Sequence, residues 1–290
     1  MRDSLVPVLE IGGTHVTAAI VETGGWTVGA AQRLALDSKA DADAILATMA
    51  RAGSALDGVE GRPWGVAMPD PFDYATGIGR FHGVGKFESL DGVDVRSALA
   101  RSLPDPERIA FTNDADAFSV GEAQHGAGAS YARCVGLTLG TGVGSGWVVD
   151  GRAVAGGPGV PPGGRIHLVE AHGRPLEDTM SRRAIRRAYA ADTGDGDADV
   201  REIADRARAG QPAALDVLTH ALCRLGEVIG PRLREFGADV LVIGGSMSGS
   251  WDLFEPWLRA GMAGVAVPIA VSADTERAAL LGAAQVALLA

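Results

Sequence analysis

A short polar stretch, Thr112-Asn113-Asp114, lies where a predicted strand ends and a predicted helix begins. Asn and Asp are favoured at the N-cap of a helix, so capping is the first interpretation of this stretch. A carboxylate at a strand end can also accept the proton of a substrate hydroxyl during phosphoryl transfer, and a neighbouring Asn can hydrogen-bond a sugar. For this stretch alone the cap is the preferred interpretation, and Asp114 as a general base is the alternative. Asp116 would point to a different face of the helix.

Three glycine turns, each directly after an apolar strand, have the composition of phosphate-binding loops. Closely spaced backbone N–H groups with no Cβ in the way suit phosphate oxygens, and a threonine adds a hydroxyl donor. Each turn alone is better explained as an ordinary turn. The three turns are Gly12-Gly13-Thr14, Gly140-Thr141-Gly142 and Gly244-Gly245-Ser246. Together they predict a clamp for a nucleotide or a polyphosphate between two domains.

Composition and missing motifs exclude several other classes. The sequence has no P-loop, no dinucleotide-binding G-x-G-x-x-G, no H-E-x-x-H and no G-x-S-x-G. Its 290 residues, 47% hydrophobic and 21% charged, suit a globular protein of about two domains. A net charge of −10 argues against nucleic acid or an anionic membrane as partner. Two cysteines, no apolar leader and no apolar run of about 18 residues predict a cytoplasmic protein.

The sequences around the first two glycine turns resemble each other. Leu9–Glu22 can be set over Leu137–Asp150 without gaps, so that Gly12 meets Gly140 and Ile20 meets Val148. Each segment reads as strand, glycine turn, strand, which is the pattern of a hairpin. We interpret the match as an internal duplication, with two similar α/β domains that each begin with a hairpin.

Hydrophobic patterning predicts the elements that carry these residues. Apolar runs bounded by glycine or proline predict strands, and apolar residues at helical spacing predict helices. Strands are expected at 6–11, 16–21, 64–68, 108–112, 135–139, 147–149, 240–243 and 265–271. Helices are expected at 41–56, 93–103, from 113 onward, and at 177–191, 200–209, 213–235 and 276–289.

Taken together, these motifs resemble those of the ROK family of sugar kinases, within the actin–hexokinase–Hsp70 fold group. The similar segments are 10–14 and 139–144 (phosphate motifs), 113–117 (the N-D-A-[ND]-A catalytic motif), 65–71 (G-x-x-x-P-G-P), 243–245 (adenosine motif) and 281–284 (terminal helix). The resemblance covers nearly the whole chain, with the motifs in the family's order.

The resemblance implies a fold and a reaction. The fold would be two duplicated α/β domains of the actin-like ATPase (ribonuclease H-like) type with an interdomain cleft. Residues 1–112 with 276–290 would form a small domain and residues 113–275 a larger one. ATP or polyphosphate would donate a phosphoryl group, with Mg²⁺, to a hydroxyl of a hexose or related sugar. A homodimer is also implied.

The resemblance also implies roles for single residues. Asp114 would be the base and would contact the sugar together with Asn113, His167 and Glu177; the spacing of the last two alone indicates no function. ATP would be bound by Gly12, Gly13, Thr14, Gly140, Thr141, Gly142, Gly244 and Gly245. Glu10 stands where the family has Asp and would contact Mg²⁺ through water.

Three further departures from the family pattern bear on the site. Asp70 replaces the Gly of P-G-P, and Gly164 stands where the family has a sugar-binding Glu three residues before its His. No cysteine lies at 170–177, so no structural zinc site is expected. Losing a carboxylate at position 164 relaxes the demand for one particular hydroxyl. We therefore include an altered sugar, an amino sugar or a cyclitol of secondary metabolism among the expected acceptors. Asp70, Arg80, Lys86 and Arg165 are further candidates that the sequence does not rank.

Two other functional classes are compatible with the family. A sugar-responsive repressor would need a helix-turn-helix before the core, and with a strand starting at Val6 we expect none. A catalytically silent sugar-binding regulator is favoured by the changes at Glu10 and Gly164. The retained Asn113-Asp114 pair and the phosphate turns favour an active kinase.

Overall fold

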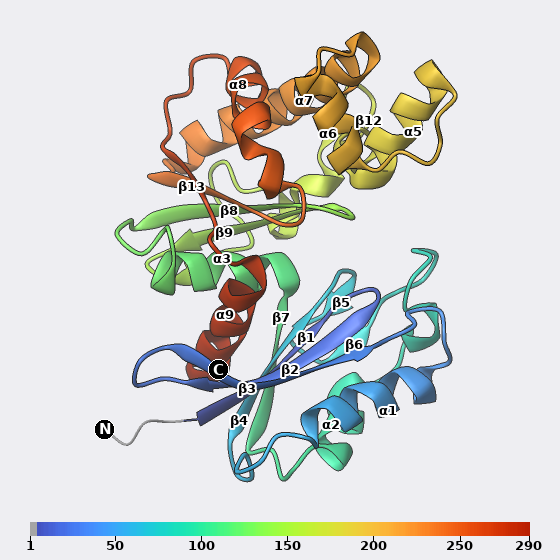
Figure 1. Ribbon diagram of the computed structural model, residues 1–290. Helices are drawn as coiled ribbons and strands as arrows, with labels where there is room; N and C mark the ends of the chain where they lie inside the picture. The colour runs from blue at the N-terminus through green and yellow to red at the C-terminus, as the bar shows by residue number, and fades with distance from the viewer. Residues whose placement is uncertain (1–4) are drawn as a thin grey trace. The chain divides into compact units, whose positions relative to one another are not determined.

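The computed structural model describes residues 5–290, which fold into two compact units (Figure 1). Unit 1 takes in the chain up to His125 and again Glu276–Ala290, and unit 2 takes in Gly126–Thr275. The helix that follows Asn113 therefore packs with unit 1, whereas the sequence put the boundary at residue 112.

Unit 1 is built on a five-stranded sheet in the order β3-β2-β1-β4-β7. Strands β1 (Leu5–Ile11), β2 (His15–Glu22) and β3 (Thr27–Ala35) pair antiparallel, whereas β4 (Pro63–Met68) and β7 (Arg108–Asn113) extend the sheet parallel to β1. The carboxyl ends of β1, β4 and β7 therefore meet at one edge of the sheet, where ligands bind in open α/β sheets.

Helices cover both faces of this sheet (Figure 1). Trp64 and Gly65 are neighbours on β4, so they face opposite sides. Trp64 packs against α1 (Ala42–Gly53), beside which α2 (Val95–Ser102) lies. Gly65 packs against α9 (Thr275–Leu289) so closely that an added Cβ would lie 2.2 Å from the carbonyl oxygen of Ala283. The last helix of the chain therefore completes unit 1.

Unit 2 repeats the strand pattern of unit 1. Its sheet has the order β10-β9-β8-β13-β14, with antiparallel pairs among the first three strands and parallel pairs from β8 onward. The strands are β8 (Arg133–Leu139), β9 (Val143–Val149), β10 (Arg152–Ala153), β13 (Val240–Gly244) and β14 (Ile269–Val271). The equal order and direction of the strands support the interpretation of an internal duplication.

The two hairpins differ in the length of their turns. Residues 12–15 separate the paired Ile11 and Val16, whereas only residues 140–142 separate the paired Leu139 and Val143. The gap-free alignment is therefore right for the first strand of each hairpin and wrong by one residue for the second strand.

The helices of unit 2 are α4 (Glu177–Met180), α5 (Arg182–Thr193), α6 (Val200–Arg208), α7 (Pro212–Phe236) and α8 (Trp251–Gly261). The helix expected at 177–191 is interrupted because Ser181 is extended and accepts a hydrogen bond from the Ala184 N–H at 3.2 Å, which caps α5. Shorter pieces are β5 (Phe72–Asp73), β6 (Ile78–Gly79), η1 (Glu88–Leu90), η2 (Pro162–Gly164), η3 (Ile166–Leu168), β11 (Glu170–Ala171), β12 (Arg174–Pro175) and η4 (Ser248–Ser250).

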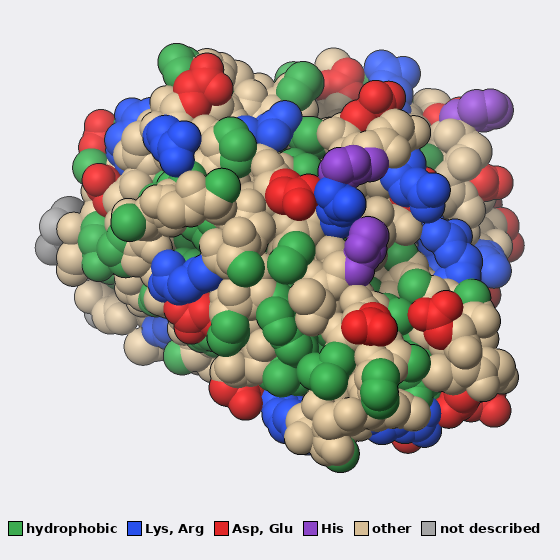
Figure 2. Space-filling model, turned by 90° about the horizontal axis from the view of Figure 1, so that it is seen from above, with side chains coloured by type: hydrophobic (Ala, Val, Ile, Leu, Met, Phe, Trp, Pro, Cys, Tyr) green, Lys and Arg blue, Asp and Glu red, His purple; other side chains and the backbone are tan. Residues whose placement is uncertain are grey.

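The surface carries charges of both signs. Figure 2, which looks onto the helices of unit 2, shows acidic and basic side chains interspersed over this face. Among residues 5–290, no helix combines the length and the apolar character needed to cross a bilayer.

Candidate functional site

Asn113 is the last residue of β7 and is only 3% exposed. Its Oδ1 accepts hydrogen bonds from the backbone N–H groups of Ala115 at 2.9 Å and Asp116 at 3.2 Å. These bonds satisfy donors at the start of α3 (Asp114–His125), so the capping interpretation of this residue is confirmed. The cap also fixes the direction in which the next residue, Asp114, leaves the sheet edge.

The amide nitrogen of Asn113 reaches the segment after β4. It donates to Asp70 Oδ2 at 2.9 Å and to the Tyr74 hydroxyl at 3.2 Å. The Tyr74 hydroxyl lies 2.8 Å from Asp70 Oδ1 and 3.0 Å from the carbonyl oxygen of Met68, so its proton is shared between these acceptors. Because Met68 pairs with Asn113 across the parallel strands, β4 and β7 deliver all three side chains to the same sheet edge.

Arg96 on α2 holds the turn that carries Tyr74. Its guanidinium donates to the carbonyl oxygens of Tyr74 at 3.3 Å and Ala75 at 3.0 Å. The same group donates to the carbonyl oxygen of Ile109 on β7 at 2.7 Å and lies over the Phe111 ring. The turn is thereby fastened to the strand that ends at Asn113.

Asp114 carries an unusual carboxyl group. Solvent reaches this side chain, yet protein surrounds it closely enough that desolvation raises the pKa of Asp114 to about 6. The Lys86 ammonium and a hydrogen bond from the Ala115 N–H lower the pKa, whereas the charges of Asp70 and Glu10 raise it further. A carboxylate with a pKa near neutral pH is suited to general base catalysis.

Glu10 lies on β1, just before the first glycine turn. Its Oε2 is buried and, among the described residues, has no hydrogen-bond partner; His15 Nε2 lies 3.5 Å from it. The turn itself is closed by a 2.8 Å hydrogen bond from the Gly12 N–H to the His15 carbonyl. A carboxylate oxygen in this state fits the needs of Mg²⁺ or of a water bound to Mg²⁺.

Gly13 and Thr14 form the exposed tip of this first turn. A Cβ built on Gly13 would meet no atom within 4 Å, and the residue does not have a positive φ. Neither packing nor backbone conformation therefore requires glycine at position 13, and its bare backbone leaves room for a ligand to approach closely.

The second glycine turn, at 140–142, lies in unit 2. Its backbone is closed by a 3.0 Å hydrogen bond from the Gly140 N–H to the Gly142 carbonyl, and Gly140 also accepts from the Arg182 N–H at 3.0 Å. Glu177 Oε1 would lie 2.7 Å from a Cβ on Gly142, so its carboxyl group rests against this turn. Thr141 is exposed at the tip.

The third turn, at 244–246, lies beside the second. Gly245 has a φ of +88°, and a Cβ there would lie 2.3 Å from the carbonyl oxygen of Leu139. The Met247 N–H donates to the same carbonyl at 3.0 Å, and Ser246 Oγ lies 3.3 Å from the Cβ position of Gly140. Gly245 is thus required by the backbone, and it brings the two turns of unit 2 together.

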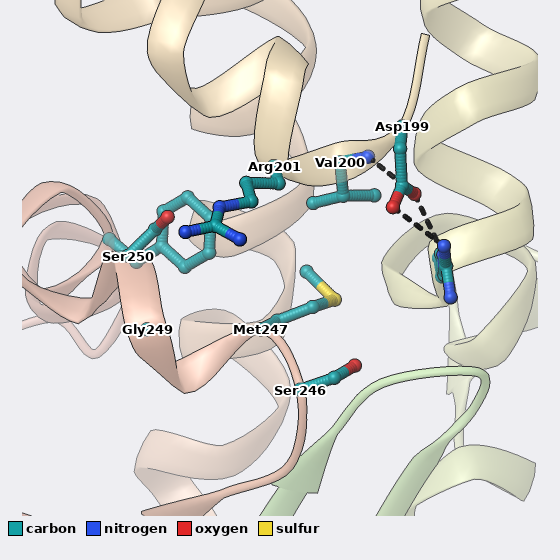
Figure 3. Close-up of a pocket in the computed structure, with 9 residues that line it drawn as sticks. Asp199, Val200, Arg201, Ser246, Met247, Gly249 and Ser250 are labelled. Atoms are coloured by element: carbon teal, nitrogen blue, oxygen red, sulfur yellow. Dashed lines mark hydrogen bonds and ion pairs between the residues drawn. The ribbon is translucent and has the colours of Figure 1, made fainter. Parts of the chain in front are cut away.

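A pocket of about 340 Å³ opens next to these turns (Figure 3). It is lined by Arg182, Asp199, Val200, Arg201, Ser246, Met247, Gly249, Ser250 and Phe254. Arg182 forms two hydrogen bonds with Asp199, at 2.7 and 2.6 Å, and closes one wall. Arg201 extends into the pocket toward Ser250 (Figure 3). Within the described chain, Arg201 makes no hydrogen bond or ion pair, so its guanidinium can receive a ligand.

His167 lies in η3 in another part of unit 2 and is half-buried. Ser145 holds its loop, because the Ser145 hydroxyl donates to the Gly164 carbonyl at 2.5 Å and accepts from the Ile166 N–H at 3.1 Å. The loop that contains Gly164 and His167 is thus anchored to β9.

The structure separates the predicted residues into groups. Glu10, Asn113 and Asp114 gather at the sheet edge of unit 1, and in unit 2 Glu177 joins the turns at 140–142 and 244–246. Of the unranked candidates, Asp70 and Lys86 act on Asp114, whereas Arg80 pairs with Asp73 at 3.4 Å.

Sequence reasoning missed Tyr74 and Arg201. Tyr74 follows the strand that ends at Met68. If that strand had been placed parallel to the one that ends at Asn113, Tyr74 would have been a candidate for the same sheet edge. No sequence signal marked Arg201. In residues 5–290, no group of three His, Cys, Asp or Glu side chains could hold a metal ion.

The chain is similar to known proteins over nearly its whole length. A family model described as the ROK family matches residues 7–289. Glucokinase from Thermotoga maritima is 26% identical over 306 aligned residues, covering 96% of this chain and 95% of that protein. N-acetylgalactosamine kinase AgaK from Shewanella sp. strain ANA-3 is 27% identical over 269 residues, covering 83% and 81%. The crystal structure of a ROK hexokinase from Thermus thermophilus has a TM-score of 0.83 at 24% identity, covering 99% and 98% of the two chains. The expected α/β fold of the actin-like ATPase type is thereby confirmed.

Proposed function

Because this chain belongs to the ROK family, we propose that it is a kinase that transfers a phosphoryl group from ATP to a hydroxyl of a hexose or related sugar. Two relatives similar over most of their length, a glucokinase and an N-acetylgalactosamine kinase, support a sugar as acceptor. The observation that carries the proposal is the carboxyl group of Asp114, held at the start of α3 with a pKa of about 6.

Asp114 acts as the general base. At neutral pH a carboxyl group with this pKa is mostly ionised, so it can accept the proton of the sugar hydroxyl as the oxygen attacks the terminal phosphorus. The bond from the hydroxyl oxygen to phosphorus forms, the bond to the leaving phosphate oxygen breaks, and the proton stays on Asp114 until it passes to water. Most of the rate enhancement that the base does not supply comes from holding the attacking hydroxyl and the leaving phosphate in line.

Asn113 orients this base rather than acting on the proton. Its carbonyl oxygen caps α3 and its amide nitrogen bonds Asp70 and Tyr74, so both ends of the side chain hold protein groups in place. A sugar contact by Asn113 remains part of the proposal and would replace or share one of these bonds. His167 and Glu177 are proposed as sugar contacts on the family pattern alone.

The donor is bound by the glycine turns and the pocket of unit 2. The exposed backbone at Gly13 and the turn at 140–142 supply N–H groups for phosphates, and Thr14 and Thr141 add hydroxyls. The pocket beside Ser246 and Met247 has a volume that suits the adenosine part of ATP. Polyphosphate, the alternative donor, would use the turns without needing the pocket.

Mg²⁺ fits the oxygen donors at the first glycine turn. Glu10, whose Oε2 has no hydrogen-bond partner among the described residues, would hold the ion through water. When bound, Mg²⁺ neutralises charge on the transferred phosphate. We further propose a homodimer on the family pattern, and a cytoplasmic location on the low cysteine content.

A coupled ADP-release assay tests the function. The full chain is supplied with ATP, Mg²⁺ and a panel of hexoses, amino sugars and cyclitols, and polyphosphate is tried as a second donor. Turnover on one acceptor that falls at least a thousandfold in Asp114→Asn supports the kinase and its base. Asp116→Asn, which removes the same charge two residues further along the first turn of α3, is the matched control and keeps turnover within about threefold.

Two results would change the assignment. Full turnover in Asp114→Asn would exclude Asp114 as the base. Silence on the whole panel, together with calorimetric binding of a sugar, would favour the catalytically silent regulator. Turnover on a cyclitol but on no hexose would assign the alternative acceptor class.

A further inference from the structure

The side-chain amide of Asn113 is held by protein groups on both sides. Its Oδ1 accepts from the backbone N–H groups of Ala115 and Asp116. Its Nδ2 donates to Asp70 and to the Tyr74 hydroxyl. An asparagine side chain has two donor and two acceptor positions, so these bonds use all four. Exchanging the oxygen and the nitrogen would set N–H groups against the N–H groups of α3, so only one orientation of the amide satisfies these partners.

The position of Asp114 depends on this amide. Within the described chain the Asp114 carboxyl group makes one hydrogen bond, in which Oδ1 accepts from the Ala115 N–H at 2.8 Å. Asn113 Oδ1 accepts from the same N–H at 2.9 Å. Because the two side chains share this donor, a change in the direction of the Asn113 amide also changes where Asp114 is held at the start of α3.

We propose that Tyr74 and Arg96 are positioning residues for phosphoryl transfer, which fix the Asn113 amide and through it the Asp114 carboxyl group. The inference rests on the proposed kinase function and deepens it. In this role neither residue touches a reacting atom. The geometry of the base matters because a displacement of about 1 Å at the reacting centre can lower the rate on the order of 100-fold.

The Tyr74 hydroxyl is placed to hold the amide. It accepts from Asn113 Nδ2 at 3.2 Å, and it lies 2.8 Å from Asp70 Oδ1 and 3.0 Å from the carbonyl oxygen of Met68. Met68 and Asn113 are paired residues at the ends of β4 and β7. The Tyr74 ring packs against Phe72, with 5.4 Å between the ring centroids. One hydroxyl therefore bridges the ends of two parallel strands.

Arg96 fixes the backbone that carries Tyr74. Its guanidinium uses four of five N–H donors on backbone carbonyl oxygens, those of Tyr74, Ala75, Thr76 and Ile109. Three of these carbonyls are consecutive in one turn, and the fourth belongs to β7. The positive charge strengthens each bond, and the planar group keeps the four carbonyls in a fixed relation. A lysine ammonium, with three donors on one nitrogen, cannot span them.

The turn does not need Arg96 in order to close. The Gly77 N–H donates to the Asp73 carbonyl at 2.7 Å, and the Thr76 N–H donates to Asp73 Oδ1 at 3.0 Å. The short strands β5 and β6 also pair across the turn. What Arg96 adds is the connection to Ile109, and so to the strand that ends at Asn113. Its role is therefore to place the turn against β7 rather than to form it.

The test compares Tyr74→Phe and Arg96→Lys with two matched controls. Tyr74→Phe removes the hydroxyl and keeps the ring, and Arg96→Lys keeps the charge and removes the planar group. Tyr189→Phe removes a hydroxyl that is hydrogen-bonded within unit 2. Arg108→Lys changes a guanidinium that donates to a carbonyl oxygen of α9 from the other end of β7. Steady-state kinetics are measured with ATP and with D-glucose or N-acetyl-D-galactosamine as acceptor.

We expect kcat to fall roughly tenfold or more in Tyr74→Phe and Arg96→Lys, while KM for the acceptor and for ATP stays within about twofold. The two controls should keep kcat within about threefold. In the Asp114→Asn background, Tyr74→Phe should lower the single-turnover rate by less than about twofold, because a residue that acts through the base has nothing left to position. A tenfold loss that persists in that background, or an unchanged kcat in Tyr74→Phe, would overturn the proposal.

Hydrogen exchange separates this inference from the kinase assignment. The amide hydrogens of Ala115 and Asp116, which Asn113 Oδ1 accepts, are followed by NMR in the full chain without substrates. They should exchange roughly fivefold faster or more in Tyr74→Phe and keep wild-type rates in Tyr189→Phe. Faster exchange supports the inference even if neither sugar is phosphorylated. Unchanged exchange makes the inference wrong even if both sugars are phosphorylated, and the kinase assignment then stands without it.

Discussion

The side chain of Asn113 links Asp70 to the start of α3: its amide nitrogen donates to Asp70 Oδ2 at 2.9 Å while its oxygen caps the helix. One buried residue thus fixes two acidic groups, Asp70 directly and Asp114 through the helix start. The relationship explains why an N-cap and a candidate catalytic motif occupy the same position of the chain.

Asn113→Ala should destabilise the protein. Loss of the cap costs about 1 kcal/mol, and loss of the bonds to Asp70 and Tyr74 costs about 1 kcal/mol more. We expect the free energy of unfolding in urea to fall by about 2 kcal/mol. Asn113→Ser retains a capping oxygen but not the amide. Its free energy of unfolding should therefore lie between those of the wild type and Asn113→Ala. Equal unfolding midpoints for Asn113→Ala and the wild type would contradict this account.

The pH dependence of kcat/KM should report on Asp114. Because the base form is active and its pKa is raised to about 6, kcat/KM for a neutral hexose should be level above about pH 7 and fall tenfold per unit well below 6. Three charged groups act on this carboxyl: Lys86, Asp70 and Glu10. Steady-state rates measured from pH 4.5 to 8.5 give the acid limb of the profile, which is the range in which kcat/KM falls as the pH is lowered.

Variants at two of these groups should move the acid limb in opposite directions. Asp70→Asn removes a negative charge that raises the pKa of Asp114, so the limb should move to lower pH. Lys86→Met removes a positive charge that lowers this pKa, so the limb should move to higher pH. Movement in the same direction, or none in either variant, would show that another group controls the limb.

Arg201→Ala should weaken binding of ATP. A guanidinium that bonds a nucleotide contributes about 1.5 kcal/mol, so KM for ATP should rise roughly tenfold. KM for the sugar should stay within about twofold. Arg183→Ala, which removes an exposed arginine outside the pocket, is the control. If Arg201→Ala binds ATP like the wild type, the pocket beside Met247 does not hold the nucleotide.

Gly13→Ala and Gly245→Ala should fail in different ways. A Cβ at Gly13 meets nothing within 4 Å, so the variant should melt within about 1 °C of the wild type but lose at least tenfold in kcat/KM for ATP. At Gly245 the φ of +88° and the Leu139 carbonyl conflict with a side chain, so stability should fall by about 2–4 kcal/mol. Thermal melts with steady-state kinetics separate the two effects.

Local patterning predicted most of the fold, because apolar strands and glycine turns are local signals. It missed β3 and α8. The β3 strand is an edge strand with mixed polar residues and a glycine, so it lacks an alternating pattern. In α8 the buried residues Trp251, Phe254 and Leu258 have helical spacing, but Pro256 lies among them. Because proline disfavours a helix interior, the sequence did not predict a helix there.

The site was less predictable than the fold, for a physical reason. Asn113 and Asp114 could be identified because a cap and a base need particular residue types in a particular order. Asp70 lies 43 positions from Asn113 along the chain. Its role depends on which strands are neighbours, and a single sequence does not contain that information. The hydration of Asp114, which sets its pKa, likewise depends on the packed protein around it.

The close fit of α9 against β4 has a consequence for the order of events during synthesis. Unit 2 is continuous along the chain, from Gly126 to Thr275, so all of its residues have been translated before α9 begins to leave the ribosome. Unit 1 has its sheet much earlier, but the face around Gly65 has no cover until the residues near Ala283 emerge. The unit that is translated first is therefore the last to be completed, and the apolar surface that α9 covers stays exposed on the nascent chain until that helix emerges.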